Sequence, residues 1–194
     1  MSKIILTTLN SKYIHCAFGL RYLYANLGEI KQQAEIQEYT IHERPLDIVE
    51  KLLEKKPKII GFSVYIWNVV ETGQCIKLLK QINPQVIIVV GGPEVSHVPD
   101  APEWLNVVDY TITGPGELQF KTLCSQLLNK TTPLENTIAG IALPLEQLNM
   151  PYEFYNSEDI KKNVEMLKIS GLDANLIQID GGWWTQRGDY LSVK

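Results

Sequence analysis

Residues that could bind or convert a ligand follow four of the strands that the sequence predicts. They fall in the ranges 10–15, 63–68, 91–97 and 114–117. Because the carboxyl ends of parallel strands meet at one edge of a sheet, where ligands bind, we expect these ranges to share that edge. The candidate binding residues within them are Asn10, Tyr13, His15, Ser63, Val64, Tyr65, Trp67, Gly91, Gly92, Pro93, Glu94, Gly114, Gly116 and Glu117.

Glycines follow two of these strands. Gly91 and Gly92 end a strongly aliphatic strand and would let something flat and bulky lie against bare backbone. One of the two could instead serve only the turn that follows. The range 114–117 (Gly-Pro-Gly-Glu) is open to two interpretations as well: the wall of a site, or a strand-to-helix turn in which Glu117 complements the helix dipole.

Aromatic residues occupy a position where a surface loop is normally polar. Tyr65 and Trp67 follow the buried strand that ends near Ser63. Either they cap the core, or they line a groove for a large ligand.

Several functions common in this architecture do not fit. The first turn lacks the glycines of a dinucleotide site, and Tyr13 with its neighbours is too bulky for a flavin mononucleotide site. Asn10 and Tyr65 stand where a phosphoacceptor domain needs acids.

The sequence also shows no recognisable complete set of catalytic residues. Neither a Ser/His/Asp nor a Cys/His arrangement is recognisable, and Glu94 and Glu117 lack an evident partner. The histidines at 15, 42 and 97 fit solvated loop positions better than a shared metal site. The sequence therefore leaves enzymatic activity of this chain uncertain and predicts no metal ligand from spacing.

Composition is that of an ordinary globular domain. The 194 residues are 45% hydrophobic and 21% charged, and 18 basic against 22 acidic residues give a net charge of −4. Without a basic stripe we expect neither nucleic acid nor membrane as partner. No signal peptide is apparent, which favours the cytoplasm. The widely spaced Cys16, Cys75 and Cys124 are expected to be buried thiols.

Alternating strand and helix patterns define the predicted fold. Strands are expected at residues 3–9, 35–41, 58–63, 85–90 and 107–113, and helices at 14–27, 45–56, 72–82 and from 117 onward. This order predicts a flavodoxin-like (Rossmann-like) α/β fold with an open parallel sheet, strand order 2-1-3-4-5, and helices on both faces.

The predicted domain covers residues 1–145. Residues 137–143 could add a strand. A C-terminal appendage, residues 146–194, is expected to hold a helix at 158–169 and a hairpin at 176–186 that contains Trp183 and Trp184. That hairpin either packs on the sheet edge or is an exposed contact for another domain or subunit.

Four short segments resemble a known family. They are residues 7–15 (Thr-Thr-Leu-Asn-Ser-Lys-Tyr-Ile-His), 61–68 (Gly-Phe-Ser-Val-Tyr-Ile-Trp-Asn), 91–94 (Gly-Gly-Pro-Glu) and 114–117. Over residues 3–155 the chain resembles the cobalamin-binding N-terminal domain of cobalamin-dependent radical S-adenosylmethionine proteins.

The resemblance implies a position for the cofactor. A corrin would lie across the strand ends, with its nucleotide tail between the third and fourth strands. Ser63 and Tyr65 would contact the tail, Gly91 and Gly92 would give it room, and residues 114–117 would line the far wall. The implied function is to present the corrin to a radical S-adenosylmethionine partner domain, in cis or in trans.

The chain departs from related patterns in two places. Better-known cobalamin domains carry Asp-x-His-x-x-Gly, whereas His15 lies one residue too far from Gly19 and lacks the Asp. We therefore expect no histidine on the lower face of the corrin, with His15 as the candidate exception.

The second departure concerns the partner domain's Cys-x-x-x-Cys-x-x-Cys motif, which is absent after Tyr155. An iron–sulfur cluster and S-adenosylmethionine are thus expected only in a partner domain missing from this chain. Two alternatives remain: a non-enzymatic interaction or regulatory domain that uses the Trp183-Trp184 hairpin, and a small-molecule transferase that uses Glu94 or Glu117.

Overall fold

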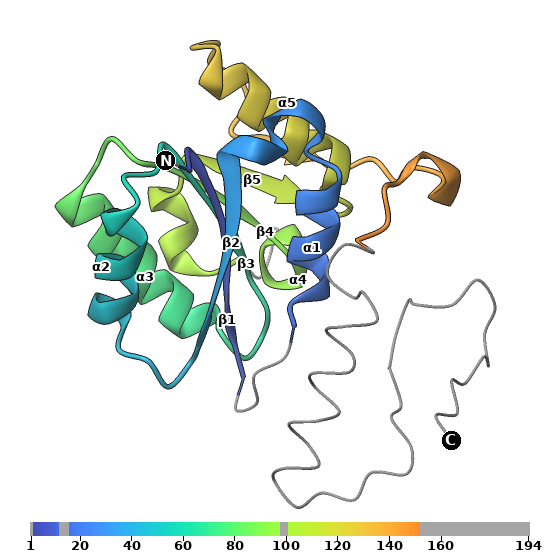
Figure 1. Ribbon diagram of the computed structural model, residues 1–194. Coiled ribbons are helices and arrows are strands. Elements are labelled where there is room, and N and C mark those ends of the chain that lie inside the picture. The colour runs from blue at the N-terminus through green and yellow to red at the C-terminus, as the bar shows by residue number, and fades with distance from the viewer. Residues whose placement is uncertain (1, 12–15, 98–100, 152–194) are drawn as a thin grey trace, which may run out of the picture. The chain divides into compact units, whose positions relative to one another are not determined.

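Six parallel strands form the centre of the fold (Figure 1). The computed structural model describes residues 2–11, 16–97 and 101–151. The strand order is β2-β1-β3-β4-β5-β6, so the flavodoxin-like order 2-1-3-4-5 is confirmed and a sixth strand extends it. The strands are β1 (Ile4–Asn10), β2 (Ala34–Thr40), β3 (Ile59–Ser63), β4 (Ile87–Gly91), β5 (Tyr110–Thr113) and β6 (Thr137–Ala139).

Helices cover both faces of the sheet, as predicted (Figure 1). On one side lie α1 (Phe18–Ala25) and α5 (Glu117–Leu128), and we call this the α1/α5 face. On the other lie α2 (Pro45–Glu54) and α3 (Val69–Ile82), the α2/α3 face. The shorter helical elements are α4 (Pro93–Ser96), η1 (Gly28–Gln33), η3 (Glu103–Val107) and η4 (Leu145–Gln147).

Burial along the strands explains their sequences. All seven residues of β1 are buried, because the strand lies inside the sheet with helices above and below it. In β2 only two of seven are buried, because this strand forms one edge of the sheet, where the predicted order also places it.

Each face of the sheet has its own hydrophobic core. On the α2/α3 face, Ile48 and Leu52 of α2 and Ile76 of α3 pack over the strands, and Trp104 of η3 joins them. On the α1/α5 face, Leu20, Leu27, Phe120 and Leu123 belong to the second core.

The first helix is shorter than predicted. It begins at Phe18 rather than near residue 14, because Ala17 is extended and its N–H donates to Glu38 Oε1 at 2.6 Å. Cys16 therefore precedes the helix and is exposed, so its expected burial was wrong.

The other two thiols are buried as predicted. Burial raises the pKa of Cys75 to about 12, with the Glu71 carboxylate adding to the effect. Burial likewise raises the pKa of Cys124.

The described residues belong to one compact unit, residues 1–151. Within this unit, η4 and residues 148–151 follow β6, and the predicted boundary at residue 145 stays a prediction. The helix expected at 158–169 and the tryptophan hairpin lie outside the described residues.

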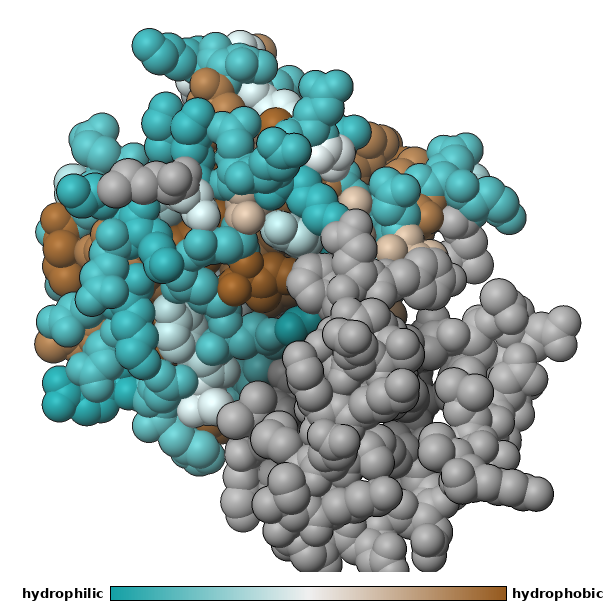
Figure 2. All heavy atoms as spheres, in the orientation of Figure 1, coloured by the Kyte–Doolittle hydropathy of each residue, from teal (hydrophilic) through white to brown (hydrophobic). Residues whose placement is uncertain are grey.

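No helix in the described ranges is long and apolar enough to cross a bilayer. Figure 2 shows a largely hydrophilic surface over the described elements, with hydrophobic side chains in separate areas.

Candidate functional site

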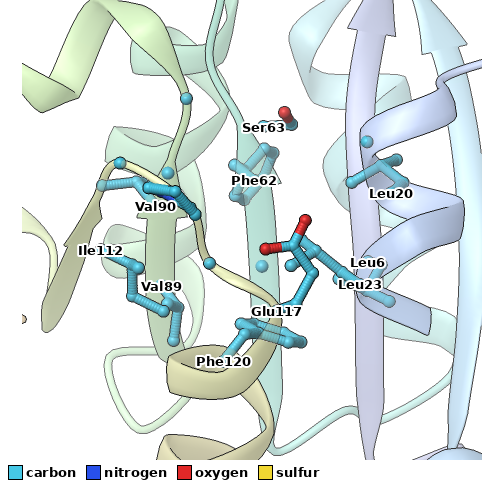
Figure 3. Close-up of a pocket in the computed structure, with 17 residues that line it drawn as sticks. Leu6, Leu20, Leu23, Phe62, Ser63, Val89, Val90, Ile112, Glu117 and Phe120 are labelled. Atoms are coloured by element: carbon cyan, nitrogen blue, oxygen red, sulfur yellow. The ribbon is translucent and has the colours of Figure 1, made fainter. Parts of the chain in front are cut away.

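A pocket of about 170 Å³ opens at the carboxyl edge of the sheet on the α1/α5 face (Figure 3). Its floor is formed by β3 and β4, and α1 and the start of α5 form its sides. Six of the candidate binding residues line it: Ser63, Gly91, Gly92, Gly114, Gly116 and Glu117.

The pocket exists because side chains on this face become smaller toward the carboxyl edge. Alternate residues of a strand face the same side. Along β3 the residues on the α1/α5 face are Ile59, Gly61 and Ser63. In β4 the corresponding series is Ile87, Val89 and Gly91. Along β5 it is Tyr110 and Ile112, followed by Gly114 directly after the strand. Three neighbouring strands thus taper together, which leaves a wedge of space under the helices.

The inner end of the pocket is closed by one aromatic ring. Phe120 is buried and lies across Gly61, where a Cβ atom would be only 2.8 Å from a ring carbon. The bare backbone of Gly61 therefore lets the Phe120 ring approach the sheet.

The two consecutive glycines have different roles. Gly92 has φ +115°, and a Cβ there would overlap the carbonyl oxygen of Val64, so the turn itself requires glycine. Gly91 has no such strain, and its Cβ would approach the Ile112 carbonyl at 3.4 Å. The turn accounts for Gly92, whereas Gly91 leaves space in the pocket.

Gly114 borders open space. It has φ +72°, and a Cβ placed on it would meet no atom of the described residues within 4 Å. Here the positive φ favours glycine, and the pocket extends to its backbone.

Two polar side chains face the pocket. Figure 3 shows the Glu117 carboxylate above the Phe120 ring, on the side of Ser63. Among the described residues, neither the Glu117 carboxylate nor Ser63 Oγ has a hydrogen-bond or ion-pair partner. Glu117 also begins α5, so it complements the helix dipole as well as lining the pocket.

Tyr65 and Trp67 form an aromatic stack in the loop after β3, outside the pocket lining. Their ring centroids are 4.6 Å apart with planes 4° from parallel. The Tyr65 hydroxyl reaches α1, where a Cβ on Gly19 would be 3.3 Å away. Trp67 is 45% exposed and the adjacent Ile66 is 75% exposed, so this loop does not cap the core.

A buried asparagine holds that loop in place. Asn68 is fully buried, and its Oδ1 accepts from the Tyr65 N–H at 2.8 Å. Its Nδ2 donates to the Leu9 carbonyl at 2.9 Å and to Thr8 Oγ1 at 3.1 Å. These bonds fix the aromatic loop to the end of β1.

Other candidates lie away from the pocket lining. Asn10 Nδ2 donates to Glu38 Oε1 at 3.3 Å, on the side of β2. The Val64 side chain is buried in the α2/α3 core, although its N–H donates to the Gly91 carbonyl. Pro93 and Glu94 begin α4.

Part of the predicted site cannot be placed. Tyr13 and His15 lie outside the described residues. Within the ranges that the structure describes, no cluster of three or more His, Cys, Asp or Glu side chains could hold a metal ion.

Sequence reasoning missed the pocket walls. The missed lining residues are Leu6, Gly19, Leu20, Leu23, Gly61, Phe62, Val89, Val90, Ile112 and Phe120. For Gly61, Val89 and Ile112 a pattern was available, namely the shrinking side chains at every second position. The residues from α1 and α5 carry no comparable pattern, because they enter through helix packing.

A family model matches most of this region. The model of the B12 binding domain matches residues 4–123, which is more than half of the chain.

Two curated relatives match parts of the chain. The chain is 31% identical over 134 residues to the cobalamin-dependent radical SAM methyltransferase TokK of Streptomyces tokunonensis, which covers 66% of the chain and 19% of that protein. It is 33% identical over 76 residues to 2-(S-pantetheinyl)-carbapenam-3-carboxylate methyltransferase of Streptantibioticus cattleyicolor, covering 37% of the chain and 11% of that protein.

Solved structures share the fold. The radical S-adenosylmethionine methyltransferase TsrM of Kitasatospora setae, with cobalamin and a [4Fe-4S] cluster bound, has a TM-score of 0.55 at 19% identity, covering 68% of this chain and 27% of that chain. The cobalamin-dependent S-adenosylmethionine radical enzyme OxsB with aqua-cobalamin has 0.54 at 17% identity, covering 77% and 24%. The chain therefore spans about a quarter or less of the length of these proteins.

Proposed function

Because this chain belongs to the B12 binding domain family, we propose that it binds cobalamin at the carboxyl edge of its sheet and presents the corrin to a radical S-adenosylmethionine partner domain. The observation that carries the proposal is the tapered pocket, which opens beside an exposed aromatic stack.

The size of the pocket supports a proposal about which part of cobalamin enters it. Drug-sized ligands occupy pockets of roughly 300–1,000 Å³, whereas this pocket measures about 170 Å³. It is too small for the macrocycle and suits the nucleotide tail. The corrin then remains at the mouth, where Trp67 and Ile66 offer exposed apolar surface.

The candidate residues take distinct roles in this arrangement. Ser63 and Tyr65 would hold the tail at the end of β3, and Gly91 would leave it room on β4. Residues 114–117 would line the far wall. Asn68 keeps Tyr65 in position through the backbone. When bound, cobalamin supplies a redox-active cobalt centre, and the chain's own residues supply orientation and exclusion of water.

The partner domain is proposed from the relatives. TokK, TsrM and OxsB are named as radical S-adenosylmethionine proteins, and the chain matches only a fraction of each. We place the iron–sulfur cluster and S-adenosylmethionine in that partner, whether it is joined to this chain or separate. The buried thiols of Cys75 and Cys124 suit the reducing cytoplasm.

A titration tests cobalamin binding. Purified protein mixed with hydroxocobalamin and passed over a desalting column should retain the red chromophore at one equivalent. Flavin mononucleotide, another flat ligand of flavodoxin-like folds, is the control and should not be retained. If no cobalamin is retained at high micromolar concentration, the interaction-domain alternative replaces this proposal.

The absence of a histidine ligand is tested separately. We propose that no histidine binds the lower face of the corrin, so a His15→Ala variant should give the same ultraviolet–visible spectrum with cobalamin as the unchanged protein. A shifted spectrum would assign His15 to cobalt and refute this part.

A further inference from the structure

The depth of the pocket is set by a contact between two residues far apart in the sequence. Gly61 in the middle of β3 has no side chain, and the Phe120 ring lies against it. A Cβ at position 61 would come within 2.8 and 2.9 Å of two ring carbons. Because Phe120 is itself buried, the ring cannot withdraw into solvent. The Gly61–Phe120 contact therefore fixes how far a ligand can enter.

The chemical character of the pocket changes with depth. Of its lining side chains, only Ser63 and Glu117 carry polar atoms. Ser63 is the last residue of β3 and Glu117 the first of α5, so both belong to the carboxyl edge. The deeper lining is hydrocarbon: Leu6, Leu23, Val89, Ile112 and Phe120. Side chains there offer neither donors nor acceptors.

The geometry points to selection among cobamides by the base of the nucleotide tail: the pocket favours dimethylbenzimidazole over a purine such as adenine. This inference rests on the proposed function. The methylated ring of dimethylbenzimidazole is hydrocarbon and matches the deep lining. Adenine would bring an exocyclic amine and ring nitrogens into the same space without side-chain partners, and burying such groups is unfavourable.

Three ligands separate this inference from the proposal on which it depends. Hydroxocobalamin, the cobamide with adenine in place of dimethylbenzimidazole, and cobinamide, which lacks the nucleotide, are each titrated into the whole chain. We expect cobalamin to bind roughly tenfold or more tightly than the adenine cobamide, and cobinamide to bind more weakly than cobalamin.

Each other outcome has a definite meaning. Equal Kd values for cobalamin and the adenine cobamide overturn base selection and leave cobalamin binding intact. Equal Kd values for cobalamin and cobinamide also overturn it, because the tail would then lie outside the pocket. If none of the three binds, both the proposed function and this inference fail.

A pair of near-isosteric variants tests the apolar lining. Val89→Thr places a hydroxyl in the deep part of the pocket, and we expect it to narrow the preference for cobalamin over the adenine cobamide severalfold. Val86→Thr is the matched control, because Val86 is equally buried but belongs to the α2/α3 core. Unchanged selectivity in Val89→Thr, or an equal change in both variants, contradicts the inference.

The Gly61–Phe120 contact is tested by a substitution and by a second substitution that should reverse its effect. Gly61→Ala pushes the Phe120 ring into the pocket, so cobalamin should bind about tenfold more weakly while cobinamide binding stays the same. Adding Phe120→Leu to that variant should restore much of the affinity by making room for the new methyl group. Circular dichroism confirms that each variant is folded. If folded Gly61→Ala binds cobalamin with an unchanged Kd, the Gly61–Phe120 contact does not limit how far the ligand enters.

Discussion

The two faces of the sheet are built from the same strands but packed differently. On the α2/α3 face, β3 contributes Ile60 and Phe62, and Val64 follows the strand; all three side chains are large and buried. On the α1/α5 face the same strand contributes Ile59, Gly61 and Ser63. The α2/α3 face is closely packed and the α1/α5 face contains the pocket, so we call them the sealed face and the hollow face. Because side chains alternate between the two faces along a strand, one strand is enough to produce both.

Glycine occurs on both faces, so glycine alone does not mark a binding site. On the α2/α3 face a Cβ at Gly73 of α3 would overlap the ring of Trp104, which fills the space. On the α1/α5 face Phe120 covers Gly61, but the space at Gly114 is open. The difference lies in whether a neighbouring side chain fills the gap. Where none does, the gap is available to a ligand.

The largest expected effect is on the sealed face. Trp104→Ala removes a buried ring whose Nε1 donates to the Val69 carbonyl at 3.1 Å, and should lower the free energy of unfolding by about 3–5 kcal/mol. Urea unfolding measures the loss, and Trp104→Phe should lose less. In protein that remains folded, the Kd for cobalamin should not change. A weakened Kd would mean that the two faces are not independent.

The converse substitution is on the hollow face. Gly91→Val adds a side chain at the pocket without requiring a positive φ, so the affinity for cobalamin should fall roughly tenfold to a hundredfold. Titration with hydroxocobalamin measures the fall. Ile88→Val, on the opposite face of the same strand, is the control and should cost about 0.5–1.5 kcal/mol of stability without changing affinity. Unchanged affinity in Gly91→Val would remove Gly91 from the site.

A smaller effect is expected at the mouth. Trp67→Ala removes an exposed ring, so stability should change by less than about 1 kcal/mol, while cobalamin affinity should fall roughly threefold to tenfold. Ile82→Ala provides the control, because Ile82 is also exposed but ends α3 at the opposite edge of the sheet. If both variants bind cobalamin normally, the aromatic stack does not contact the corrin.

The smallest expected effect concerns the two buried thiols. Cys75 lies in the core of the α2/α3 face and Cys124 in the core of the α1/α5 face. Burial raises the pKa of Cys75 to about 12 and also raises that of Cys124. The reactive thiolate is therefore scarce in both at pH 8, and a thiol reagent should modify the exposed Cys16 first. Mass mapping of labelled peptides, with urea-unfolded protein as the reference, checks this. Rapid labelling of Cys124 would show that the hollow extends through the α1/α5 core.

The order of elements could be predicted because the local patterns agree with the fold. Continuous aliphatic runs gave β3 and β4, and Pro45 with Asp47 gave the start of α2. The start of α1 was misjudged because a long-range contact, from the Ala17 N–H to Glu38, keeps the chain extended. No helix was predicted at the four residues of α4, because Gly91 and Gly92 before them and Pro93 at their start are also typical of a loop.

The candidate site was predictable in part. Ser63, Gly91 and Glu117 stood out because they lie at or just after the carboxyl ends of strands, and all three line the pocket. Val64 is also at a strand end, but alternation turns its side chain to the sealed face. The role of Asn68 was missed, because its hydrogen bonds reach Thr8 and Leu9 in a strand some 60 residues earlier.

The sequence by itself determined the parallel α/β fold, the edge at which the candidate residues meet, and the likeness to cobalamin-binding domains, because these follow from periodicity, chain order and short motifs. Only the tertiary structure decided which face is hollow. Pocket depth depends on Phe120 reaching Gly61, and the mouth depends on Tyr65 reaching Gly19. Both are contacts between a helix and the sheet or its loop, and such contacts depend on how helices pack, which no local pattern encodes.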